Sequence, residues 1–279
     1  MAEVGVASKS STDASQYGGG DFVTASLFLR RVVPGADANG RSLPVSLLPG
    51  LRATAMLIAT LPKLSVSLTD SPPGERLRRH FGDRIWGIRH SRLAQGVLSL
   101  PEERGAYLRG RSRQAVRTSI RKALAAGIVC RPLDSLEERR AVVRQVVPGM
   151  AERADDLLLA PGDLWRAAFA PSGEPVAVAQ VTVDCEWALL KALVSTDHAS
   201  RYLLHTDLVN ALVEAKARHL LVDGPMAPLL APELQYWQRL LGYRVASLSV
   251  RRKPLPVEGC KPAFEIESNQ TLIALRHVG

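Results

Sequence analysis

Apolar and polar residues follow regular periods over most of the chain beyond residue 107, and each period predicts a helix or a strand. A 3.6-residue period predicts helices, whereas short apolar runs bounded by turn residues predict strands. Helices are expected at 107–126, 135–147, 159–169, 202–217 and 233–241, and strands at 128–133, 174–184, 186–195, 219–224 and 243–252. This order, with a β-hairpin turning near Cys185 and Glu186, predicts an α/β (α+β) chain built on one mixed β-sheet flanked by helices.

Composition divides the chain into four parts. Residues 1–20 are small, polar and glycine-rich, so we expect a disordered tail. Residues 21–106 alternate short apolar runs with Pro/Gly-rich breaks, which predicts an N-terminal extension packed on the core; a divergent half-domain is the alternative. Residues 107–252 hold the predicted core domain with its basic lead-in helix, and residues 253–279 form a C-terminal extension.

The predicted helix 107–126 carries a row of four arginines at i+4 spacing: Arg109, Arg113, Arg117 and Arg121. Like charges at this spacing repel, by a few tenths of a kcal/mol per pair. The row is therefore either offset by a bound anion or tolerated in solvent. In the first case Arg113 and Arg117, at the centre of the row, are the candidate substrate-binding residues.

The whole chain is basic, with 36 Lys and Arg residues against 27 Asp and Glu and a net charge of +9. A polyanionic partner such as nucleic acid, or the phosphates of a cofactor, would fit this charge; an arginine-rich composition is the alternative explanation. No apolar run reaches the roughly 18 residues of a membrane helix, so no membrane insertion is expected. The first residues lack the features of a secretory signal, which predicts a cytoplasmic protein.

The three cysteines, Cys130, Cys185 and Cys260, are odd in number and far apart. They lack the close C-x-x-C or Cys/His spacing of zinc ligands, so we expect neither a metal site nor a disulfide-stabilised scaffold.

Two phrases, LVSTDHASRYLLHTDLVNALVEAKA and QYWQRLLGYRV, resemble the GNAT superfamily of acyl-CoA N-acyltransferases over roughly residues 127–252. The preceding RSRQAVRTSIRKALAAGI is similar to the basic helix that leads into the GNAT-like half of Fem-type aminoacyltransferases. The resemblance implies a GNAT-like fold and transfer of an acyl group from acyl-CoA to a small-molecule or peptide amine. For a Fem-type enzyme it implies charged transfer RNA as the donor. A non-catalytic binding protein on the same fold is the third alternative.

In GNAT enzymes two central strands splay apart and the next helix points its N-terminus at the donor's pyrophosphate, which backbone N–H groups bind. The resemblance places the cofactor-binding residues around that helix start: Val194, Ser195, His198, Ser200, Arg201, Tyr202 and His205. This loop contains none of the glycines usual in the family. Fem-type enzymes also lack them, so the loop leaves the RNA-borne donor open as a rival to acyl-CoA.

Acyl transfer to an amine requires a base for the ammonium proton and an acid for the leaving group. Glu186 and Asp184, near the hairpin turn, are the candidate bases, with solvated turn acids as the alternative. Tyr236 and Tyr243 are the tyrosines nearest to the family's acid position, and Tyr243 also suits a place in the core. Asp223 ends a strand where open α/β sheets bind ligands, although Asp-Gly-Pro is also an ordinary turn. The sequence does not indicate the oligomeric state.

Overall fold

The computed structural model describes residues 55–56, 59–85, 88–147, 162–222 and 232–253. The predicted tail, 1–20, and all but the first residue of the predicted extension 253–279 lie outside them. The strands are β1 (Lys63–Leu68), β2 (Arg84–Ile85), β3 (Ile88–Arg89), β4 (Gln95–Ser99), β5 (Val129–Pro132), β6 (Asp163–Phe169), β7 (Pro175–Asp184), β8 (Trp187–Ser195), β9 (His219–Val222) and β10 (Arg244–Arg252). The α-helices are α3 (Pro72–Gly82), α4 (Gln114–Ala125), α5 (Leu136–Val146), α7 (His198–Glu214) and α8 (Pro232–Leu240).

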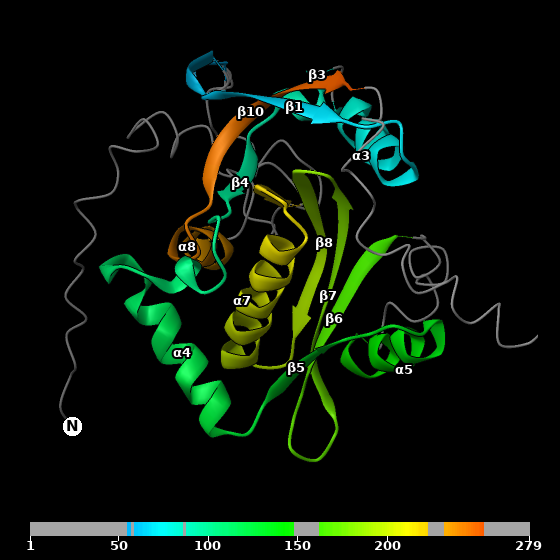
Figure 1. Ribbon diagram of the computed structural model, residues 1–279. Helices are drawn as coiled ribbons and strands as arrows, with labels where there is room; N and C mark the ends of the chain where they lie inside the picture. The colour runs from blue at the N-terminus through cyan, green and yellow to red at the C-terminus, as the bar shows by residue number, and fades with distance from the viewer. Residues whose placement is uncertain (1–54, 57–58, 86–87, 148–161, 223–231, 254–279) are drawn as a thin grey trace, which may run out of the picture.

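The predicted mixed β-sheet flanked by helices is confirmed. Eight of the described strands form one sheet in the order β1-β10-β4-β9-β8-β7-β6-β5 (Figure 1). Strands β5 to β8 are antiparallel neighbours, and α7 then crosses over so that β9 runs parallel to β8. Strands β1 and β4, which come from the predicted N-terminal extension, pair with β10 and so join the same sheet as the core strands.

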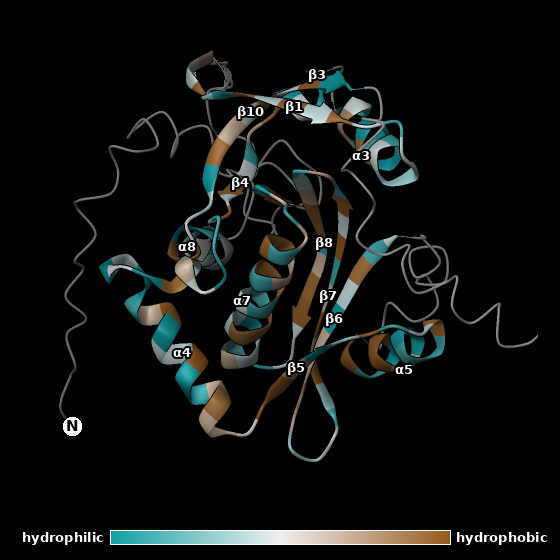
Figure 2. Ribbon diagram, in the orientation of Figure 1, coloured by the Kyte–Doolittle hydropathy of each residue, from teal (hydrophilic) through white to brown (hydrophobic). Residues whose placement is uncertain are grey.

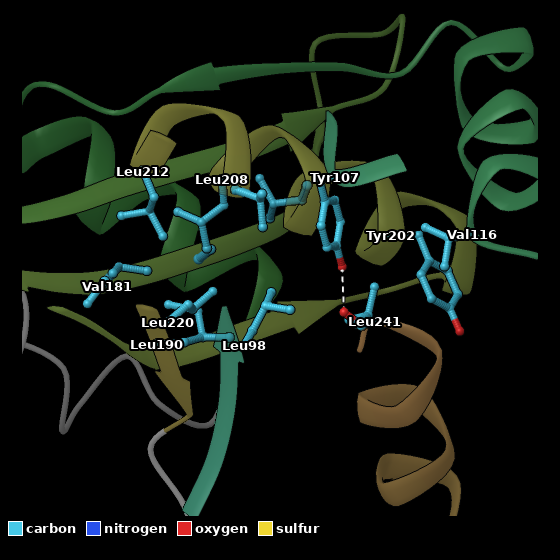
Figure 3. Packing of buried hydrophobic residues seen from close by; sticks show 14 of the residues in the cluster. Leu98, Tyr107, Val116, Val181, Leu190, Tyr202, Leu208, Leu212, Leu220 and Leu241 are labelled. Carbon is cyan, nitrogen blue, oxygen red and sulfur yellow. Dashed lines mark hydrogen bonds between the residues drawn. The ribbon is translucent and has the colours of Figure 1, made fainter. Parts of the chain in front are cut away.

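Both faces of the central strands β6, β7 and β8 are covered, because successive strand residues pack against different helices. On one face, Ala179, Val181 and Leu190 pack with leucines of α7 such as Leu208 (Figure 3). On the other face, β8 packs with α3 through Trp187 and Leu189, and β7 packs with α5 through Val178. Strands covered on both faces are apolar at nearly every position, so alternation is lost.

This loss of alternation explains the one element whose type was predicted wrongly. Residues 159–169 were expected to include a short helix, but 163–169 form strand β6 between β5 and β7. Leu164 and Ala168 face α7, whereas Trp165 and Ala167 face α5. A continuous apolar run of this length does not by itself distinguish a strand from a helix.

Local capping fixes the helix ends. The Ser71 and Ser135 side chains accept hydrogen bonds from the first-turn amides Gly74 N and Glu138 N, which starts α3 and α5. Helix α4 begins at Gln114 rather than at 107, since residues 106–108 and 111–113 form 3-10 turns. It ends at Ala125, and Gly127, two residues further on, has the φ of +73° that a left-handed helix termination requires. Figure 2 shows hydrophobic and hydrophilic residues interspersed along α4, as expected of an amphipathic helix.

Among the described helices, none combines the length and the hydropathy that a transmembrane span requires.

Candidate active site

The second half of β8, Lys191–Ser195, is called its open half, because a described strand pairs with it on one side only. β9 pairs with β8 from Trp187 to Leu190, and its described residues end at Val222. From Lys191 to Ser195, β8 keeps β7 on one side and has no described partner strand on the other. The burial pattern changes at the same point, from four buried residues to five half-buried ones. Within the described residues, the backbone groups on that second edge of Lys191–Ser195 have no ladder partner.

A β-bulge lies where this open half begins. In the β7–β8 ladder, Gln180 pairs with Ala192 and Val181 with Leu190, so Lys191 is the extra residue. A bulge bends a strand and re-aims the side chain at that point, and bulges are frequent beside active sites.

The N-terminus of α7 follows directly after this open half, and Asp197 caps it. Asp197 Oδ1 accepts hydrogen bonds of 2.8 Å from both Ala199 N and Ser200 N. Burial alone would raise the pKa of Asp197, but the hydrogen bonds from Ser200 and Ala199 outweigh it and lower the pKa. A carboxylate thus occupies the first-turn amides that the resemblance assigned to a pyrophosphate.

Six of the seven predicted cofactor-binding residues lie together at this strand end and helix start: Val194, Ser195, His198, Ser200, Arg201 and Tyr202. Arg201 Nε donates to Ser195 Oγ at 3.0 Å and so ties the first turn of α7 back to β8. His198 is exposed, and its ring meets the Tyr202 ring edge-on with centroids 5.2 Å apart. The Tyr202 ring is itself buried near Val116 of α4 (Figure 3).

The seventh residue, His205, lies two turns further along α7 in a buried aromatic cluster. Its Nε2 is 2.9 Å from the hydroxyl of Tyr243, and its ring contacts those of Tyr107 and Trp237. Burial, with a smaller effect of Arg113, lowers the pKa of His205 to about 3, and burial raises the pKa of Tyr243 well above its usual range. Both groups are therefore neutral at physiological pH, and their burial gives them a packing role.

The candidate bases Asp184 and Glu186 lie at the opposite end of β8 from the α7 N-terminus. Strand β8 spans nine residues, Trp187–Ser195, which corresponds to roughly 27 Å. The structure therefore does not bring the two acids together with the predicted cofactor-binding residues. Glu186 is exposed and pairs with Arg218 at 3.2 Å in solvent.

Asp184 is buried and joins the hairpin end to the β1–α3 loop. It accepts hydrogen bonds from Thr69 N at 2.8 Å, from the Thr69 hydroxyl at 2.5 Å and from the Ser71 hydroxyl at 2.9 Å. Its oxygens thus hold the N-terminal cap of α3 in place, which is a structural task.

The remaining predicted residues are Tyr236 and Asp223. Tyr236 lies near Tyr202, because the pKa of Tyr202 is raised chiefly by burial and in part by Tyr236. The Tyr236 side chain is exposed on α8. Asp223 lies outside the described residues.

The arginine row of the lead-in helix is partly used by the fold itself. Arg113 donates to the backbone carbonyl of Leu240, and its guanidinium lies over the Tyr107 ring. Arg117 donates to the carbonyls of Leu108 and Gly110. These contacts satisfy carbonyls at element ends, so the two central arginines of the row contribute to the fold itself.

A polar cluster that the sequence did not reveal lies on the face of α3 and α5, beside the bulge. The Asp163 side chain is fully buried and accepts hydrogen bonds from Arg76 at 2.9 Å, Gln180 at 2.8 Å and Thr182 at 2.8 Å. Lys191 Nζ lies 3.8 Å from the same carboxylate. Strand pairing brings these residues together, and the only sequence signal was a lone lysine within the apolar run WALLKALVS.

The cysteines differ from expectation in one respect. Cys185 takes part in a disulfide, which the sequence reasoning did not predict. Cys130 is a free thiol, and burial raises its pKa to about 12, so it is unreactive as a nucleophile at neutral pH.

No protein-family model matches the sequence, and no curated protein matches it. Solved structures that are similar include L-PGS from Bacillus licheniformis, with 12% identity, a TM-score of 0.43 and coverage of 55% of this chain and 58% of that one. A tandem GNAT protein from the clavulanic acid biosynthesis pathway is 13% identical, with a TM-score of 0.35 and coverage of 71% and 67%. A GCN5-related N-acetyltransferase from Kribbella flavida is 13% identical, with a TM-score of 0.33 and coverage of 55% and 53%.

The match with L-PGS spans less than two thirds of that protein's chain. Because all three TM-scores lie below 0.5, function has to be argued from the site of this chain itself.

Proposed function

We propose that the protein is an acyltransferase of the GNAT type, which forms an amide from an activated acyl donor and an amine. In this reaction the amine nitrogen attacks the acyl carbonyl carbon, a C–N bond forms, and the C–S or C–O bond to the leaving group breaks. The proton lost by the amine balances the one gained by the leaving thiol or hydroxyl.

One observation carries the proposal: the open half of β8, Lys191–Ser195, which continues directly into the N-terminus of α7. An extended donor arm can pair with a strand edge of this kind, as in β-strand addition. The bulge at Lys191 then lies where the arm's reactive end would meet the α3/α5 face of the sheet.

Acyl-CoA is the first donor to test, because the sequence resemblance implies it. A second donor class, an aminoacyl group carried on transfer RNA, is favoured by the cap at Asp197. A carboxylate that already accepts the Ala199 and Ser200 amides repels a diphosphate at that point. The net charge of +9 would also favour a polynucleotide donor.

The test is amide formation detected by mass spectrometry, with acetyl-, malonyl- and long-chain acyl-CoA and charged transfer RNA as donors and a panel of amines as acceptors. A Ser195→Tyr variant should fill the end of the open edge and lower turnover by at least about tenfold. A Ser112→Tyr variant, at an exposed 3-10 turn, is the matched control and should retain activity. Absence of product with every donor would exclude the proposal.

A further inference from the structure

In the Asp163 cluster, the carboxylate already accepts most of the hydrogen bonds that it can. Oδ1 of Asp163 accepts from Arg76 and Thr182, and Oδ2 accepts from Gln180. Three hydrogen bonds and the nearby ammonium of Lys191 use most of the roughly four lone-pair sites of a carboxylate. The carboxylate therefore has little capacity left for a positively charged ligand.

Lys191 has donor capacity to spare. An ammonium group has three donors. Among the described residues, Lys191 Nζ forms an ion pair with Asp163, and the N–O distance of 3.8 Å is too long for a hydrogen bond. The lysine side chain is only 20% exposed. The ammonium donates no hydrogen bond to a described residue, so its donors are available to an acceptor bound at this position.

Charge points in the same direction. Two cations, Arg76 and Lys191, lie within 4 Å of the Asp163 carboxylate, which also interacts electrostatically with Arg139. Asp184, two residues beyond Thr182 on β7, takes its hydrogen bonds from Thr69 and Ser71 instead. The side chains of Arg76, Lys191 and Asp163 are largely buried, and charges in such a site interact more strongly than in water.

A further donor lies on the same face. Trp165 is paired with Gln180 across the β6–β7 ladder and is 5% exposed. Its indole N–H is buried and has no hydrogen-bond acceptor within the part of the chain that the structure describes. The face thus carries unused donors around the bulge.

We propose that this cluster, Lys191 with Arg76 and Asp163, binds the carboxylate of a small-molecule substrate. The single negative charge of a carboxylate matches the one ammonium group of Lys191. Asp163 holds the two cations in place, and Lys191 contacts the ligand. Under the proposed function, on which this assignment of a substrate class rests, either the amine acceptor or the acyl group carries the carboxylate.

The binding itself is tested without turnover, by NMR of the full chain labelled with ¹³C at the lysine ε position. The Lys191 signal is assigned by its loss in Lys191→Met, and wild type is titrated with butyrate and with butyramide, its neutral isostere. The Lys191 signal should shift with butyrate and saturate, remain unchanged with butyramide, and leave the exposed Lys122 signal unmoved. No response, or an equal response to both compounds, would overturn the assignment.

Turnover then identifies the source of the carboxylate. β-Alanine is compared with its amide as acceptor, and a succinyl donor with a butyryl donor. Wild type should prefer one carboxylate-bearing substrate by about ten- to hundredfold in kcat/KM. Lys191→Met should abolish the preference, Lys191→Arg should restore part of it, and Lys122→Met should leave it intact.

The two claims fail separately. Turnover without any preference for a carboxylate overturns the substrate class and leaves the acyltransferase proposal standing. A saturating butyrate shift without turnover on any donor overturns the acyltransferase proposal and leaves the carboxylate-binding site standing.

Discussion

Replacing Asp184 with alanine should destabilise the protein strongly, because this buried carboxylate joins two distant parts of the chain. It connects the end of β7 to Thr69 and Ser71, which are more than 110 residues earlier in the sequence. The alanine variant leaves the Thr69 amide and two hydroxyl groups without their acceptor. It also removes the group that holds the Ser71 cap of α3.

The magnitude follows from those contacts. A buried donor left without an acceptor costs about 1–3 kcal/mol, and charged acceptors lie at the upper end. Because the Thr69 and Ser71 hydroxyls also bond each other, we expect a loss of about 3–5 kcal/mol for Asp184→Ala rather than the full sum. Asp184→Asn keeps an oxygen for the Thr69 amide, and the hydroxyls can rotate to accept from its NH₂ group. Its expected loss is about 1–2 kcal/mol.

The assay is urea unfolding followed by circular dichroism, with specific activity measured on each folded variant. Glu186→Gln is the control, since its exposed pair with Arg218 contributes about 0–1 kcal/mol. If Asp184→Ala were as stable as that control, the structural role would be refuted. A folded Asp184→Asn variant without activity would instead support the catalytic role that the sequence predicted.

Three further predictions concern single positions. Asp197→Ala should lower stability by about 1 kcal/mol at neutral pH and tighten coenzyme A binding in calorimetry; weaker binding would contradict the cap argument. Because the pKa of Asp197 is lowered, its stabilisation is present above its ordinary pKa of 3.8 and disappears as pH falls below it. Gly242→Ala should be more destabilising in thermal unfolding than Gly173→Ala. Both glycines have positive φ, so the backbone strain is shared. An added Cβ at Gly242 would lie 2.0 Å from Arg113 Nη2, whereas nothing lies within 4 Å of one at Gly173. His205 has a folded pKa of about 3, so the free energy of unfolding should fall by up to about 1.4 kcal/mol per pH unit as pH drops from about 6.5 towards 3. His205→Gln should abolish that part of the acid sensitivity in urea unfolding. An unchanged dependence of stability on pH in this variant would refute the prediction.

Most of the fold could be predicted from the sequence because its helices and its central hairpin carry local signals. The hairpin of β7 and β8 and the capped helix α5 were predicted within one or two residues. Helix α7 begins at His198, near the start that the GNAT resemblance implied, whereas the apolar period predicted a start at 202; the local signal was Asp197, a good N-cap residue. The prediction for β6 was wrong because both faces of this strand are buried, which removes the alternation that identifies a strand.

The candidate site was harder to predict because its residues meet through strand register. The distance along β8 separates Glu186 from the α7 N-terminus, and that separation could have been counted from the length of the predicted strand. To predict the contact of Lys191 with Asp163, one must recognise β6 as a strand and place a one-residue bulge correctly in β8. Neither has a sequence signature, and a shift of one residue in register would reverse every side chain.

The most direct test of the account is a crystal structure of the protein with an unreactive acyl-donor analogue. We predict an extended donor arm along the Lys191–Ser195 edge of β8, with its acyl carbonyl beside the bulge and the Lys191 side chain. A donor bound elsewhere, or a β8 edge paired along its whole length by the protein's own chain, would contradict the central claim.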